Sequence, residues 1–261
     1  MKLMRLFSHY VKLNLQSAME YRAAFLTQVF GMILNNSAFI VFWLVLFRAV
    51  GDDIAGWGFT AVMFLWSITA FGFGLASVFL GNALYLSRII YTGELDVYLL
   101  QPKPILPNVL WSRSIVSGWG DAAYGLVLFG LTQPLSVAGI AIFLGFGVAL
   151  ALVLTAIRVI YHSLTFYFGN AEDFATTAGE LVILFSMYPG GVFDGPTMWL
   201  LHSVIPAALV AFIPAQLFAS FDTTLLLAVL AADALIIAGA VIVFARGVRR
   251  YESGNRIGAR L

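Results

Sequence analysis

Long apolar runs without a charged residue constrain this sequence more than any other feature. The run from Phe59 to Leu84, for example, contains no Asp, Glu, Lys or Arg. A helix needs about 20 mostly apolar residues to cross the roughly 30 Å of hydrocarbon in a membrane. Because 61% of the residues are hydrophobic and only 10% are charged, a soluble core of this size could not bury them. The sequence therefore predicts an integral membrane protein.

We expect an all-α membrane protein with a single transmembrane domain over residues 1–261. Residues 1–22 are expected to form an interfacial helix, residues 23–245 to hold six transmembrane helices, and residues 246–261 to form a cytoplasmic tail. The fifth span is the shortest, and it carries Glu180. The expected spans are Ala23–Phe47, Phe59–Leu84, Val109–Leu131, Val137–Tyr161, Phe174–Tyr188 and Thr224–Ala245.

The N-terminal segment is amphipathic. Leu3, Phe7 and Tyr10 recur at helical spacing, while Lys2 and Arg5 lie on other faces. Such a helix lies along the inner membrane surface or packs on the cytoplasmic side of the protein itself, and the pattern fits both arrangements.

The region between the fifth and sixth expected spans is rich in proline and glycine. Its apolar part, Met198–Phe212, is shorter than a span and is interrupted by His202 and Pro206. Proline removes a backbone donor that lipid cannot replace. We therefore expect a re-entrant helical hairpin on the outer side rather than a seventh crossing.

The basic residues support this topology. With six spans and a cytoplasmic N-terminus, only Arg48 of the 14 Lys and Arg residues lies outside, as the positive-inside rule requires. A seventh crossing would move the basic cluster from Arg246 to Arg260 to the outer side. Both chain ends are therefore expected in the cytoplasm.

The inner loop between the second and third spans has the start and stop signals of a short helix. Gly93 precedes it and Pro102 follows it, and acidic residues occupy its first turn, where the helix dipole favours negative charge. It is either a knob that docks on another protein or a helix that rests on lipid headgroups. The candidate docking residues are Glu94, Leu95, Asp96, Tyr98, Leu99 and Leu100.

Six polar residues are placed within the spans, where ionisable groups are functional candidates. The asparagines line a lumen or join helices. Arg158 and Glu180 are expected at one level of adjacent antiparallel helices, as a structural pair or as part of a proton relay. The six are Asn35, Asn36, Asp121, Arg158, Glu180 and Asp233.

The segment Gly118-Trp-Gly-Asp121 matches the G-x-G-D signature of intramembrane aspartyl proteases. Their chemistry needs two carboxylates that share a proton, and only Asp233 could supply the second one at membrane depth. The alternative is that the glycines let helices approach closely while Asp121 forms a hydrogen bond across the interface.

The sequence lacks the residue patterns that several kinds of ligand binding require. No G-x-x-x-x-G-K-[ST] phosphate loop occurs, so this chain is not expected to bind ATP in that way. It has no cysteine and only three scattered histidines, which argues against a metal site. A net charge of +1 gives no basic face for nucleic acid. We expect no cofactor in this chain.

The whole chain resembles the membrane subunit of a bacterial ATP-binding-cassette (ABC) exporter of the second type, in the viologen-exporter-like subgroup of permeases. The resemblance rests on the N-terminal helix, the six spans, the outer re-entrant region, the loop from Gly93 to Pro102 and the tail Arg249-Arg-Tyr-Glu-Ser-Gly-Asn255.

The resemblance implies that Glu94–Leu100 is a coupling helix seated in a separate ATPase subunit, which binds ATP and magnesium. It also implies two permease chains, identical or sister, with the path along spans one, two and five. The resemblance further implies a location in the bacterial inner membrane and a cargo that is an amphipathic or hydrophobic compound, such as a drug in multidrug efflux. The alternatives are a stand-alone secondary transporter and a protease-like membrane enzyme.

Overall fold

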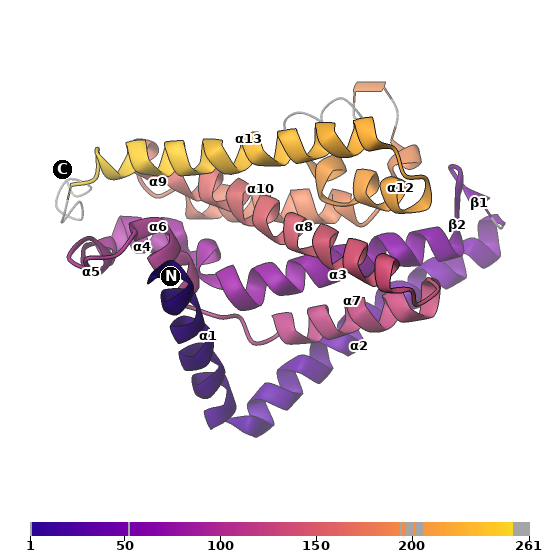
Figure 1. The fold of residues 1–261 in the computed structure, drawn as a ribbon, viewed down its shortest axis with the longest axis horizontal. Coiled ribbons are helices and arrows are strands. Elements are labelled where there is room, and N and C mark those ends of the chain that lie inside the picture. The colour runs from indigo at the N-terminus through magenta and orange to yellow at the C-terminus, as the bar shows by residue number, and fades with distance from the viewer. Residues whose placement is uncertain (1, 52, 194, 197–200, 202–205, 253–261) are drawn as a thin grey trace.

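The computed structural model describes residues 2–51, 53–193, 195–196, 201 and 206–252, and most of them are helical (Figure 1). The elements in chain order are α1 (Lys2–Glu20), α2 (Arg22–Val50), β1 (Asp53–Ile54), β2 (Trp57–Gly58), α3 (Phe59–Leu80), η1 (Gly81–Tyr85), α4 (Leu86–Thr92), α5 (Leu95–Leu99), α6 (Ile105–Trp111), α7 (Gly118–Thr132), α8 (Val137–Ser163), α9 (Thr165–Phe168), α10 (Glu172–Ser186), η2 (Gly190–Val192), η3 (Ala208–Phe212), α12 (Ile213–Ala219) and α13 (Thr223–Val248). The helices form an elongated bundle, with the β1–β2 hairpin at one end and α5 at the other (Figure 1). We call these the hairpin end and the α5 end.

The start of α1 and the end of α13 both lie toward the α5 end (Figure 1). Four helical runs among the described residues are long and apolar enough to cross a membrane, and they include the expected first, second, fourth and sixth spans. The expected fifth span corresponds to α10, which has 15 residues and so extends about 22 Å. The count of six spans stays a prediction. The four long runs are Arg22–Val50, Phe59–Thr92, Val137–Phe168 and Thr223–Val248.

The third span differs from our expectation of one helix over Val109–Leu131. The structure has two helices there, α6 and α7, joined by a non-helical linker. Within the linker, the Ile115 amide donates to the carbonyl of Ser77 in α3 at 2.9 Å. The Arg113 guanidinium stacks 3.8 Å from the ring centroid of Tyr85. These contacts with α3 and η1 replace the helical bonds that a continuous span would have made.

Helix α3 occupies the centre of the bundle and packs against both α7 and α8. Glycines allow its close contact with α7. A Cβ atom on Gly74 of α3 would collide with the backbone of Ala122, and one on Gly125 of α7 would lie 2.5 Å from the Ser67 carbonyl oxygen. Such small-residue contacts are typical of helix interfaces in membranes, where dispersion forces drive association.

Helix α2 lies at the edge of the bundle and meets α1 in a V near Tyr21 (Figure 1). Its main contact is with α7. Large apolar side chains cover its outer side, including Leu26, Phe30, Leu34 and Phe42, which are all exposed.

The hairpin end is closed by the β1–β2 turn. Ala55 and Gly56 both have positive φ, of 55° and 83°, as a tight hairpin turn requires. The Asp53 carboxylate accepts a hydrogen bond from the Gly56 amide at 2.8 Å, which fixes the turn.

The predicted re-entrant hairpin, with its apolar part Met198–Phe212, lies partly outside the described residues. The described portion returns at η3 and continues into α12, and Ala208–Ala219 forms a short apolar helix at the hairpin end. Phe212 and Leu217 are buried in the same apolar cluster as Phe64 of α3 and Phe143 of α8. The re-entrant path stays a prediction.

Candidate functional site

The α5 helix is anchored to the bundle through its inner side. Gly93 ends α4 with a φ of 83°, which turns the chain into α5. Leu95 is fully buried in an apolar cluster that also contains residues of α4, α6, α8 and α13. The hydroxyl groups of Tyr98 and Ser112 share a hydrogen bond of 2.9 Å. The helix is therefore held in a fixed position rather than free in a loop.

The outer side of α5 is apolar and exposed. Val97 and Leu100 are 61% and 86% exposed, and Leu99 is 37% exposed. The sequence pattern grouped Leu95 with Leu99 among the docking residues, but the structure turns Leu95 inward. It also brings Val97, absent from the predicted set, to the surface beside Glu94. The i, i+3 spacing of Val97 and Leu100 is the signal that could have found this face.

Helix α1 is joined to the α5 region by a chain of hydrogen bonds. Tyr10 donates to the side-chain oxygen of Asn108 in α6 at 2.6 Å, and the Asn108 amide donates to Gln101, just after α5, at 3.2 Å. Asn14 donates to the Trp111 carbonyl at 3.0 Å. The predicted amphipathic helix therefore packs on the protein with one side, and it exposes apolar side chains on another.

The end of α13 also meets α5. The ring of Tyr251 packs edge-on against Phe166 of α9, with centroids 6.1 Å apart. Burial of the phenol, followed by hydrogen bonding with Asp96 and the charge of its carboxylate, raises the pKa of Tyr251 to about 12. The neutral phenol is thus favoured beside Asp96, and α5 is connected to the last span as well as to α6.

Two of the predicted intramembrane residues form a buried pair. The Asn36 amide of α2 donates to Oδ1 of Asp121 in α7 at 2.7 Å, and Tyr124 donates to the Asn36 carbonyl at 3.2 Å. Oδ2 of Asp121 has no hydrogen-bond partner among the described residues. The pair borders a cavity of about 180 Å³, whose wall includes residues of α2, α3, α7 and α10. Asn35 also borders this cavity but is exposed, and its amide lies 3.7 Å from the Met32 sulfur.

Arg158 and Glu180 lie on one cavity, as their expected level in adjacent helices suggested. The cavity has a volume of about 340 Å³ and lies between α8, α10 and α3. Arg158 is only 3% exposed, whereas Glu180 is exposed. In the described part of the chain, Nε and Nη1 of Arg158 have no hydrogen-bond partner. The guanidinium instead faces the ring of Phe73, 5.2 Å from its centroid.

The structure does not assemble an aspartyl protease dyad. Asp121 lies in α7 and Asp233 in α13, and α8 runs between these two helices (Figure 1). Asp121 is paired with Asn36, while Asp233 is buried and its Oδ1 has no partner among the described residues. Two carboxylates that share a proton must touch, so the G-x-G-D match is better explained by helix packing.

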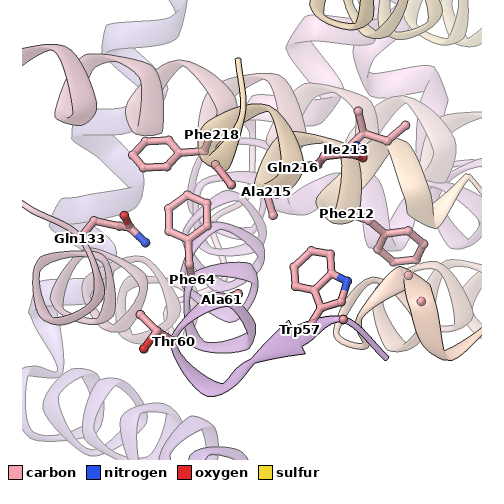
Figure 2. Close-up of a pocket in the computed structure, with 14 residues that line it drawn as sticks. Trp57, Thr60, Ala61, Phe64, Gln133, Phe212, Ile213, Ala215, Gln216 and Phe218 are labelled. Carbon is pink, nitrogen blue, oxygen red and sulfur yellow. The ribbon is translucent and has the colours of Figure 1, made fainter. Parts of the chain in front are cut away.

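A larger cavity of about 790 Å³ opens at the hairpin end. Figure 2 shows aromatic rings from four segments around it: Trp57 of β2, Phe64 of α3, Phe212 of η3 and Phe218 of α12. The ring centroids of Phe64 and Phe218 are 4.5 Å apart. The polar side chains in the lining are Thr60, Gln133 and Gln216, and none of the described lining residues is charged. Sequence patterns did not reveal this cavity, because its walls come from distant parts of the chain.

The described residues contain no group of three or more His, Cys, Asp or Glu side chains that could hold a metal ion.

A family model described as "ABC-2 family transporter protein" matches residues 33–255, which is most of the chain. This chain belongs to the ABC-2 transporter family. As an ABC-2 protein it is a multi-pass permease subunit, and its family implies an ABC ATPase as partner. Searches of curated proteins and of solved structures gave no match.

Proposed function

We propose that this ABC-2 permease belongs to the viologen-exporter-like subgroup and forms the translocation path of an ATP-driven exporter as a pair of permease chains. Each chain docks a separate ATPase subunit through α5. ATP and magnesium bind to that subunit, and the permease has no catalytic residue of its own. The proposed setting is the bacterial inner membrane, with both termini in the cytoplasm.

The observation that carries the proposal is the two-sided character of α5. Its outer side exposes Val97 and Leu100, an apolar surface that a partner protein can cover. Its inner side is fixed through Leu95, Tyr98 and the neighbourhood of Tyr251. A force applied to the outer side by ATPase closure is therefore passed to the bundle, as a coupling helix requires.

The pairing of two permease chains is supported by the outer sides of α2 and α10. Phe30 and Leu34 of α2, and Phe174 and Leu184 of α10, are exposed apolar residues. The cavity at the Asn36–Asp121 pair borders α2, α3 and α10, the helices of the three spans expected to line the path. The proposed cargo is an amphipathic or hydrophobic compound, as in multidrug efflux.

Co-purification tests the docking. The chain is expressed with its genomic neighbours and purified in mild detergent, once unchanged and once with Val97→Ala and Leu100→Ala. The control variant carries Leu131→Ala and Leu135→Ala, two exposed residues near the hairpin end. We expect an ATPase with a phosphate loop to accompany the unchanged chain and the control, and to be lost from the α5 variant.

Two results contradict the proposal. If the α5 variant retains the ATPase as well as the control does, α5 is not the docking element. If no ATPase binds the unchanged chain and purified permease transports on an ion gradient alone, the stand-alone secondary transporter replaces the exporter.

A further inference from the structure

The cavity between α8 and α10 contains a buried cation whose hydrogen-bond donors are only partly used. Arg158 is 3% exposed, and among the described residues its Nε and Nη1 have no hydrogen-bond partner. The Phe73 ring at 5.2 Å offers only a weak cation–π contact. Glu180 acts on this cation through its charge, but no described residue accepts a hydrogen bond from Nε or Nη1. Buried donors without acceptors are costly, so this guanidinium can bind a further anion in direct contact.

A second unpartnered nitrogen lies one helical turn away. His162 is completely buried, and its Nδ1 is 2.8 Å from the hydroxyl of Ser87. Its Nε2 has no partner in the described part of the chain. Residues at i and i+4 share a helix face, and both Arg158 and His162 line the same cavity. The Ser87 hydroxyl can donate either to Nδ1 at 2.8 Å or to the His162 carbonyl at 3.3 Å. In the tautomer in which it donates to Nδ1, the ring proton lies on Nε2 and is available to an acceptor.

The remaining lining of the cavity suits a hydrocarbon body. Phe73, Leu84, Ile183 and Leu184 contribute apolar walls to the volume of about 340 Å³. Glu180 also lines the cavity, but it is exposed, and it leaves Nε and Nη1 of Arg158 without a partner among the described residues. Its carboxylate therefore lies at the exposed rim of the cavity and acts on Arg158 through its charge, so it can partner the guanidinium when the cavity is empty and yield to a better-placed anion.

We propose that this cavity binds an amphipathic anion, with the carboxylate, sulfonate or phosphate head group against Arg158 and His162 and the apolar body against the α3 and α10 walls. The cavity lies toward the α5 end, near the close of α8. The assignment of this anion as cargo rests on the exporter function proposed above. The binding site itself does not, because it is defined by the permease alone.

The first test uses the permease without any ATPase. The purified chain is placed in phosphatidylcholine nanodiscs and titrated with the fluorescent fatty acid 11-(dansylamino)undecanoic acid, with its uncharged methyl ester as the matched ligand and empty nanodiscs as background. We expect the acid to bind at least about tenfold more tightly than the ester, since hydrogen bonds to charged groups are strong in a desolvated site.

Four variants locate the site. Arg158→Gln is expected to weaken binding of the acid by roughly tenfold or more, while Arg158→Lys keeps the charge and part of the affinity. Gly179→Val fills the cavity, since a Cβ there meets Arg158 Cγ at an ordinary 3.8 Å, so it reduces binding without removing the charge. Arg48→Gln, at the hairpin end of α2, is expected to bind as the unchanged chain does. Equal affinity for acid and ester, or unchanged affinity in both Arg158→Gln and Gly179→Val, overturns the proposal.

A second test separates cargo from resident lipid. If the acid stimulates ATP hydrolysis by the assembled permease and ATPase, and Arg158→Gln abolishes the stimulation, the anion is cargo. If the acid has no such effect, and mass spectrometry finds an anionic phospholipid retained by the unchanged chain but lost from Arg158→Gln, the site binds a membrane lipid and the cargo assignment is wrong. Failure to recover any ATPase contradicts the exporter function and leaves the nanodisc result standing.

Discussion

Helices α2 and α3 are both long and apolar, yet they have opposite environments. In the most apolar part of each run, 83% of the residues are buried for the run that begins with α3, and only 11% for α2. The difference follows side-chain size. The glycines of α3 lie in contact with α7 and α8, whereas a Cβ atom added to Gly31 of α2 would have no atom within 4 Å. Apolar character tells which helices enter the membrane, and small residues tell which one lies at the centre.

The strongest test of this comparison places the same side chain at a glycine in each helix. Gly74→Leu in α3 inserts atoms where the backbone of Ala122 already lies, so we expect a loss of at least about 3 kcal/mol and little folded protein. Gly31→Leu in α2 meets open space and is expected to behave as the unchanged chain. Thermal unfolding monitored by size-exclusion chromatography measures both. Equal stability of the two variants contradicts the assignment of α3 as the central helix.

A smaller effect is expected from the polar pair that attaches α2 to the bundle. Asn36→Leu leaves the Asp121 carboxylate without its 2.7 Å partner, and we expect a loss of about 1 to 2 kcal/mol. The neighbouring substitution Asn35→Leu is the control, because Asn35 is exposed and its amide forms only a weak bond, with the Met32 sulfur, among the described residues. The same unfolding assay applies. If Asn35→Leu destabilises as much as Asn36→Leu, the pair is not what holds α2.

The exposed side of α2 allows a test that leaves stability unchanged. The chain has no cysteine, so single cysteines report proximity directly. We expect Phe30→Cys to form a disulfide-linked dimer in membranes, since Phe30 is 61% exposed on the proposed contact side of α2. Leu235→Cys, on α13 and 73% exposed, is expected to stay monomeric on gels. If Leu235→Cys alone forms the cross-link, the contact between permease chains lies on α13, and the exposed side of α2 faces lipid.

The smallest expected effect is the pH dependence of stability that Tyr251 causes at α5, where the chain continues from α3 and α4. Burial and the nearby Asp96 carboxylate raise the pKa of Tyr251 to about 12, against 10.0 for a free tyrosine. Between these values the unfolded state loses the proton first, so the contribution of Tyr251 to stability is constant below pH 10 and falls as the pH rises toward 12. Thermal unfolding is expected to show a loss of stability over this interval in the unchanged chain and a smaller loss in Tyr251→Phe. An identical pH dependence in the two chains removes the role of Tyr251.

The sequence predicted the positions of α2, α8, α10 and α13 closely, because composition alone decides which segments lipid can accept. It missed the break between α6 and α7, since that depends on the bond from Ile115 to Ser77 and on Arg113 stacking on Tyr85. Both contacts join residues that are far apart in the sequence, so the local sequence pattern does not predict them.

The candidate sites divide in the same way. Gly93 and Pro102 revealed where α5 lies, but a helix of five residues is too short for periodicity to tell its inner side from its outer side. The partners Asn36 and Asp121 are 85 residues apart, and the sequence around either residue does not indicate which residue it pairs with. Arg158 and Glu180 could be brought to one cavity by reasoning, because their helices were expected to be antiparallel neighbours.

The helical run from Phe59 to Thr92 joins the two ends of the bundle, and its backbone departs from helical geometry at Leu80 and at Tyr85. One end, with Phe64, forms a wall of the aromatic cavity, and the other leads into α5. The η1 segment lies between α3 and α4 in this run. There the Asn82 amide donates to the Val109 carbonyl at 2.9 Å and to the Ser112 hydroxyl at 2.8 Å. These two bonds resist bending at η1, so they help a movement at one end of the run to reach the other.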